Sequence, residues 1–143
     1  MAYLDWNPAF DTGIRSIDFE HRRLVDLLNE VDRQIASGAD ARAVTGTLGE
    51  FHALASAHLA LEESIMERTE QPGLDTRVLA HRALLDGVRD IMDAFHTGQT
   101  RPDSLPDQLK EWLRQLMGMD VTVFSGLYSS LSAETLKSWG LQR

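Results

Sequence analysis

Five ionisable side chains interrupt the apolar stripes of four candidate helices, at His21, His58, Glu62, His81 and Asp120. His58 and Glu62 are four residues apart, and all five are in phase with apolar residues spaced three or four apart. This spacing puts side chains on one helix face, so the five should point toward a shared core. Buried ionisable groups are costly unless they are paired or bind a metal. Three imidazoles with two carboxylates offer nitrogen and oxygen donors that suit iron, manganese or zinc.

The alternative is a structural polar network without a metal. A single histidine in a core is more often a hydrogen-bonded structural residue than a ligand, whereas a buried His-x-x-x-Glu pair is rarer. Five such residues on four helices favour the metal interpretation. The other two histidines do not join the set. His52 is six residues before His58 and should face elsewhere, and His96 falls at the end of its helix.

Four stretches with helical periodicity position these side chains, and no strand-like alternation longer than a few residues occurs. Short segments with turn or capping residues separate the stretches, so consecutive helices should pack as antiparallel neighbours. The sequence therefore predicts an all-α fold, an up-down-up-down four-helix bundle. The residues that indicate helix starts and ends are Asp18, Gly38, Asp40, Gln71-Pro72-Gly73, Asp75, Gly98 and Pro106.

The chain of 143 residues suits a single domain, 1–143. Residues 1–17 are rich in aromatic and apolar side chains but too broken for a helix, so we expect an N-terminal arm packed across the bundle. The bundle itself should occupy about residues 18–130, and a short C-terminal tail helix is expected from Ser132.

Composition excludes several classes of protein. The chain has no cysteine, which rules out disulfides, thiolate metal sites and cysteine nucleophiles. A net charge of −8 disfavours nucleic acid or an anionic membrane as a partner. No run of about 18 apolar residues and no secretory signal is present, so a cytoplasmic location is expected. There is no phosphate-binding glycine motif and no nucleophile–base pair, so we expect no enzyme activity beyond adventitious peroxidase chemistry.

At this point the sequence resembles a known family, the bacterial hemerythrins. The first matching segment is the most specific: Trp6-x-Pro8-x-Phe10-x-x-Gly13-Ile14-x-x-Ile17-Asp18-x-Glu20-His21-x-x-Leu24. Further matches are His58-x-x-x-Glu62-Glu63-x-x-Met66, Pro72-x-Leu74, His81, Leu109-Lys110-Glu111-Trp112-Leu113 and Asp120. The resemblance covers about residues 6 to 128. It implies a four-helix bundle that holds two non-haem irons and binds dioxygen reversibly.

The resemblance also implies a role for each of the five residues. Family members hold their two irons with five histidines, one glutamate and one aspartate, and the carboxylates bridge the irons. By position, His21 and His58 match the histidines of the iron with an open place for dioxygen. Glu62 and Asp120 match the two bridges. His81 matches one of the three histidines on the other iron.

Two positions depart from the family pattern. The His-x-x-x-His of the third helix is replaced by Arg77-x-x-x-His81. On the fourth helix, the family histidine lies four residues after the tryptophan and five before the bridging aspartate. Here Trp112 and Asp120 are only eight apart, so the missing histidine corresponds to Leu116 or to Gln115. The three-histidine iron has therefore lost two of its terminal ligands.

This loss predicts an altered site. Reversible dioxygen binding in the family draws one electron from each of two irons, so half a site should be a poor oxygen carrier. We expect a mononuclear site of His21, His58, Glu62 and Asp120, resembling the facial triad of non-haem iron. Such a site would bind or sense dioxygen, nitric oxide or peroxide, and a sensing role would need a partner protein. Arg77 should place its guanidinium near the vacated position and pair with Glu62 or Asp120.

Two alternatives stay open. A dioxygen-binding di-iron centre could still assemble, with Gln115, a water or Glu63 in place of the missing ligands. Otherwise the site is metal-free and the protein is an interaction module. Iron, as one or two ions, is the expected cofactor, with another divalent metal as the substitute.

Overall fold

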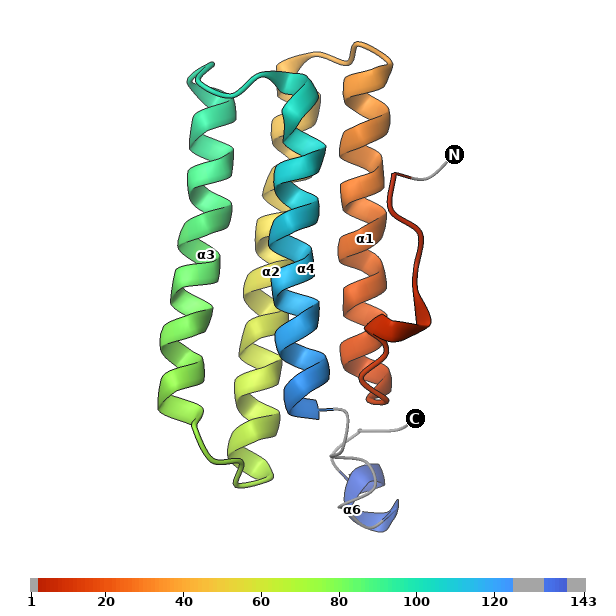
Figure 1. Ribbon diagram of the computed structural model, residues 1–143, viewed down its shortest axis with the longest axis vertical. Helices are drawn as coiled ribbons and strands as arrows, with labels where there is room; N and C mark the ends of the chain where they lie inside the picture. The colour runs from red at the N-terminus through yellow and green to blue at the C-terminus, as the bar shows by residue number, and fades with distance from the viewer. Residues whose placement is uncertain (1–2, 125–132, 139–143) are drawn as a thin grey trace.

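A computed structural model describes residues 3–124 and 133–138 of the chain. Figure 1 shows four long helices that run alternately up and down beside one another, which confirms the predicted all-α four-helix bundle. Each helix contacts the next along the chain, and α4 closes the bundle against α1. The long helices are α1 (Arg15–Ala36), α2 (Ala41–Arg68), α3 (Leu74–His96) and α4 (Leu105–Phe124). The short ones are η1 (Pro8–Phe10), η2 (Pro102–Ser104) and α6 (Ala133–Ser138).

The sequence predicts the bundle over about residues 18–130, and the long helices that the structure describes run from Arg15 to Phe124. Residues 125–130 of the expected bundle, and Ser132 as the expected start of the tail helix, lie outside the described residues. Helix α6 is the short helix expected near the C-terminus. None of the helices in the described part of the chain is both long and apolar enough to cross a membrane.

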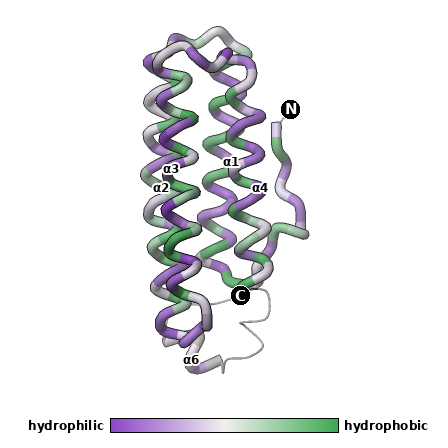
Figure 2. Tube along the Cα trace, turned by 60° about the vertical axis from the view of Figure 1, so that its left-hand side comes forward, coloured by the Kyte–Doolittle hydropathy of each residue, from purple (hydrophilic) through white to green (hydrophobic). Residues whose placement is uncertain are grey.

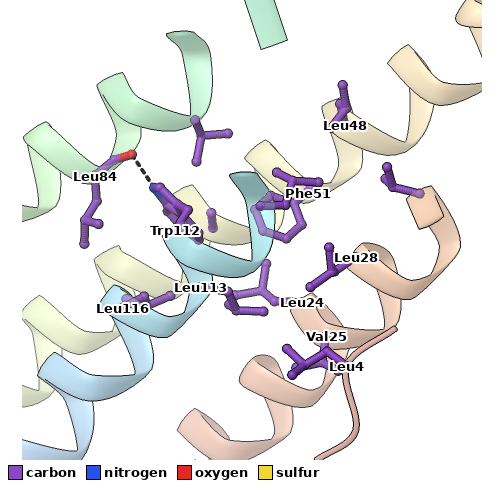
Figure 3. Close-up of a cluster of buried hydrophobic side chains, with 14 of the residues drawn as sticks. Leu4, Leu24, Val25, Leu28, Leu48, Phe51, Leu84, Trp112, Leu113 and Leu116 are labelled. Atoms are coloured by element: carbon purple, nitrogen blue, oxygen red, sulfur yellow. Dashed lines mark hydrogen bonds between the residues drawn. The ribbon is translucent and has the colours of Figure 1, made fainter. Parts of the chain in front are cut away.

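The core consists of two apolar clusters stacked along the bundle. Hydrophobic and hydrophilic positions alternate with the helical repeat along each long helix, so one face of each turns inward (Figure 2). The larger cluster, shown in Figure 3, contains Phe51 and Trp112. Their rings pack edge to face, with 5.4 Å between the ring centroids. The Trp112 indole N–H donates to the Leu84 carbonyl at 2.7 Å, which ties α4 to α3. The smaller cluster is formed by Ile14, Ile17, Ile65, Met66 and Phe124.

The start of α1 differs from the prediction. Asp18 was expected to cap the helix, but α1 begins three residues earlier, at Arg15, and its N-cap Ile14 has no side-chain hydrogen bond. Asp18 instead lies in the first turn and reaches back to the preceding loop. Its Oδ1 accepts from the Thr12 amide and hydroxyl, both at 2.8 Å, and its Oδ2 accepts from the Gly13 amide at 3.2 Å. The carboxylate therefore fixes the angle at which the N-terminal arm enters the helix.

The N-terminal arm packs on the bundle, as expected, and runs beside α1 (Figure 1). Leu4 is buried in the larger cluster, and its backbone amide and carbonyl exchange hydrogen bonds with the Asn29 side chain at 2.8 and 3.0 Å. Trp6 is only half-buried and stacks under the Arg22 guanidinium at 4.4 Å. The η1 turn contacts α4. The arm thus covers the seam between α1 and α4.

We predict that Asp18→Ala lowers the free energy of unfolding by about 1–3 kcal/mol, because it leaves the donors of buried Thr12 without an acceptor. Chemical denaturation monitored by circular dichroism measures the change. Asp26→Ala is the matched control, since Asp26 is exposed on the same helix and should shift stability by less than about 0.5 kcal/mol. Equal stability of the two variants would contradict this role for Asp18.

Candidate metal centre

A polar layer separates the two apolar clusters. His21 of α1, His58 and Glu62 of α2 and Asp120 of α4 each offer one donor atom, and these four atoms all lie within 4.8 Å of one another. All four residues are at most 1% exposed. Two donors on opposite sides of one ion are separated by about 4 Å, so the cluster has nearly the dimensions of a metal site.

The contacts inside this cluster are short. His21 Nε2 lies 3.1 Å from His58 Nε2 and 2.6 Å from Asp120 Oδ2. His58 Nε2 is also 3.2 Å from Asp120 Oδ2 and 3.6 Å from Glu62 Oε1. Two imidazole nitrogens and two carboxylate oxygens, from three helices, therefore converge on one point.

His81 of α3 lies at the edge of this group rather than inside it. Its Nε2 is 3.2 Å from Glu62 Oε2, and its Nδ1 is 2.8 Å from Glu63 Oε2. His81 is 2% exposed, whereas the Glu63 side chain is 32% exposed. The structure thus brings four of the five predicted residues into one cluster and joins the fifth to it through Glu62.

Several buried polar atoms of this layer make no hydrogen bond to any described residue. They are both Glu62 oxygens, Asp120 Oδ1, His21 Nδ1 and His81 Nε2, and of these His81 Nε2 and Glu62 Oε2 are in ion-pair contact at 3.2 Å. Buried polar atoms are paired in most proteins, so orphans gathered in one place need an explanation. A metal ion would satisfy oxygen and imidazole donors together, and the residues present therefore fit a metal of the iron, manganese or zinc type.

The charges of His58 and Asp120 depend on one another. Burial alone would lower the pKa of His58, but the carboxylates of Asp120, Glu20 and Glu62 outweigh it and raise this pKa to about 11. Burial alone would raise the pKa of Asp120, but Glu62, His21 and His58 beside it hold this pKa below its usual range. An imidazolium and a carboxylate therefore stabilise each other inside the core.

The pKa values of Glu62 and His81 are both raised. Burial raises the pKa of Glu62, and the neighbouring Asp120 carboxylate adds to the rise because two like charges repel. Burial alone would lower the pKa of His81, but Glu62 and Glu63 outweigh it. In the absence of a cation the layer thus balances its carboxylates with protons.

At two of the positions that the resemblance matches to the three-histidine iron, the side chains are not those of the family pattern. Leu116 is fully buried and belongs to the larger apolar cluster (Figure 3), whereas Gln115 is exposed. Counting four residues from Trp112 therefore gives the inward position, whereas Gln115 lies on the exposed side of α4. Glu63 binds the outer nitrogen of His81, so in this structure it does not fill the gap either.

Arg77 does not form the predicted ion pair. Among the described residues it makes no hydrogen bond or ion pair with Glu62 or Asp120, and its Nη1 is buried without a partner. The physical reason is that both carboxylates already contact imidazoles, at 2.6 to 3.6 Å. Arg77 is instead one of the residues that line a groove between α3 and α4.

The contact of His58 with the carboxylate of Glu20 was not predicted from the sequence. Glu20 of α1 lies with its Oε1 3.0 Å from His58 Nδ1, and its side chain is 20% exposed. A carboxylate on the far nitrogen fixes the tautomer and orientation of a metal-binding imidazole. The position of Glu20 directly before His21 in the first motif was the sequence feature that could have indicated this role. His52 and His96 lie outside the metal-binding group, as expected.

Comparison with known proteins identifies relatives over most of the chain. A family described as the hemerythrin HHE cation binding domain matches residues 12–121. The bacteriohemerythrin of Stenotrophomonas maltophilia is 30% identical over 114 residues, which cover 79% of this chain and 73% of the relative. The bacteriohemerythrins of Pseudomonas aeruginosa and Pseudomonas paraeruginosa are each 27% identical over 113 residues, with the same coverage. These matches confirm the family resemblance.

We predict that Glu20→Gln weakens metal binding about 10- to 100-fold, because the amide no longer holds the His58 ring as a carboxylate does. Competition with a chromogenic chelator measures the affinity. Glu50→Gln is the control, since Glu50 is exposed on α2. The same affinity for both variants would show that Glu20 does not support His58.

Proposed function

The chain belongs to the hemerythrin HHE cation-binding family, and we propose that it holds a single iron ion and binds or senses a small ligand. The observation that carries the proposal is the convergence of His21, His58, Glu62 and Asp120 within 4.8 Å of one another. The expected small ligands are dioxygen, nitric oxide or peroxide. Reversible carriage of dioxygen by two irons is not part of the proposal.

The unequal halves of the site support one ion rather than two. The half around His21 and His58 keeps both of its imidazoles. The other half keeps His81 alone, because Leu116 extends the apolar core and Arg77 brings a positive charge. A second cation on that side would lack two neutral nitrogen donors.

The donor chemistry supports iron and leaves manganese and zinc as substitutes. When bound, iron would supply redox chemistry and an open coordination position for the small ligand. The chain would supply the rest. His21 and His58 would hold the ion, Glu20 would orient His58, and Glu62 and Asp120 would balance the charge.

The burial of the layer supports a small ligand and a binding role. His21, His58 and Asp120 are fully buried and Glu62 is 1% exposed, so a large substrate has no direct access. We therefore propose a binder or sensor rather than an enzyme, with any peroxidase activity adventitious. A sensor of this kind would pass its signal to a partner protein.

A metal-free interaction module is the second candidate. It is favoured by the close imidazole–carboxylate contacts, because protonated His58 beside Asp120 balances charge without any metal. Buried ion pairs of this kind can persist for structural reasons alone. Metal content separates the two candidates.

We expect protein purified anaerobically and loaded with iron to hold about one iron per chain, as measured by plasma mass spectrometry. Glu62→Ala should abolish binding, because it removes a central carboxylate of the cluster. Glu62→Gln keeps the side-chain volume and should also lose iron while staying folded by circular dichroism. Iron near zero in the wild type would support the interaction module, and two irons would contradict the mononuclear proposal.

We also predict that the double variant Arg77→His plus Leu116→His gains a second iron. Both changes restore imidazoles at the positions where the family pattern has them, and Leu116 is already directed into the core. The measured quantities are iron per chain and the optical absorption of an oxo-bridged pair. The single variant Gln115→His is the control, because residue 115 faces solvent. A second iron in that control, or none in the double variant, would contradict the assignment of position 116.

A further inference from the structure

A surface groove lies beside the turn that joins α2 to α3. It has a volume of about 760 Å³ and is lined by that turn, the first two turns of α3 and the end of α4. Its lining includes Gln71, Gly73, Thr76, Arg77, Gly118 and Thr122. We call it the Arg77 groove.

The Arg77 groove carries one unbalanced charge. Arg77 is the only charged residue of its lining among the described residues; the others are apolar, small or neutral polar. The Arg77 Nη1 is buried, and in the described part of the chain it has no hydrogen bond and no ion pair. Buried charged donors without an acceptor are costly. Arg77 as a whole is half-buried and lines the groove, so an anionic acceptor from outside the chain can approach the rest of its side chain.

The nearby carboxylates cannot serve as this acceptor without losing existing partners. Glu62 lies between His58 and His81, and Glu63 is bonded to His81. Asp120 lies between two imidazoles. Among the described residues, imidazoles thus balance these carboxylates, whereas the Arg77 Nη1 has no partner.

The groove also has room and further donors for a small anion. A Cβ placed on Gly118 would meet no atom within 4 Å, so the α4 wall is open at this residue. Gly73 is the N-cap of α3 and offers no side-chain acceptor to the first amides of the helix, whose partial positive charge favours anions. Gln71 and Thr76 add neutral hydrogen-bonding groups, whereas the Thr122 hydroxyl already donates to the Gly118 carbonyl at 3.0 Å.

We propose that the Arg77 groove is a binding site for a small carboxylate or oxyanion, held bidentately by the Arg77 guanidinium. The planar fork of arginine matches the geometry of such anions. The site is one helical turn from His81 and does not require a metal, so it is independent of the proposed function. It also accounts for arginine at this position, which the carboxylates of the polar layer do not.

The test is a titration of the full-length, isotope-labelled chain with acetate, nitrate and phosphate, followed by nuclear magnetic resonance. Ionic strength is held constant with chloride. We expect saturable shifts of the backbone amides of Thr76, Gly118 and Thr122 for at least one of the three anions. Acetate as the tightest ligand would identify a carboxylate site, whereas nitrate or phosphate would identify an oxyanion site. Shifts that never saturate with any of them would overturn the proposal.

Variants of two arginines on α3 locate the site. Arg77→Gln should weaken binding about tenfold or more, because charged hydrogen bonds are lost. Arg82→Gln is the matched control on the exposed side of the same helix and should bind as the wild type does. Arg77→Lys keeps the positive charge but lacks the planar guanidinium that binds an anion bidentately, so it should also bind more weakly. Wild-type affinity in Arg77→Lys would overturn bidentate binding, and wild-type affinity in Arg77→Gln would overturn the site.

A last variant separates this proposal from the metal proposal. Glu62→Ala removes a member of the polar layer but no lining residue of the groove. Anion binding should survive this change even though iron binding is lost. Anion binding that disappears in Glu62→Ala would place the anion in the polar layer and contradict the Arg77 groove.

Discussion

The structure depends on how two carboxylates are balanced inside an apolar bundle. Glu62 and Asp120 are buried between two hydrophobic clusters, where uncompensated charge would cost far more than a bundle of this size can offset. Imidazoles at 2.6 to 3.6 Å supply the balance through protons, or a cation supplies it through coordination. The same contacts that keep the fold viable without metal are therefore the contacts that define a metal site.

The two halves of this layer have diverged for different physical reasons. Leu116, which the resemblance matches to a family ligand position, belongs to the apolar cluster and adds packing where a second ion would need a donor. Arg77, which the resemblance matches to another family ligand position, is a cation that lines a groove and makes no hydrogen bond or ion pair with Glu62 or Asp120 among the described residues. His21 and His58 keep short contacts to each other and to Asp120. The residues that the resemblance matches to the two-histidine iron therefore remain together in this chain.

Much of this arrangement could be predicted from the sequence, because helical period and inward phase are local properties. The bundle and the members of the polar layer follow from them. Contacts between different elements cannot be predicted from these local properties. Asp18 bonds a loop that precedes its helix, and Glu20 bonds a histidine on another helix. The choice between Gln115 and Leu116 depended on helix rotation. The predicted ion pair of Arg77 with Glu62 or Asp120 is wrong, because imidazoles already contact both carboxylates.

The central claim is that His21, His58, Glu62 and Asp120 grip one iron. X-ray absorption spectroscopy of the iron-loaded protein tests it most directly, because it reports both the donors and any neighbouring metal. A single shell of nitrogen and oxygen donors with an imidazole contribution, and no metal–metal scattering, is the predicted result. A clear iron–iron contribution, or a shell without imidazole, would contradict it.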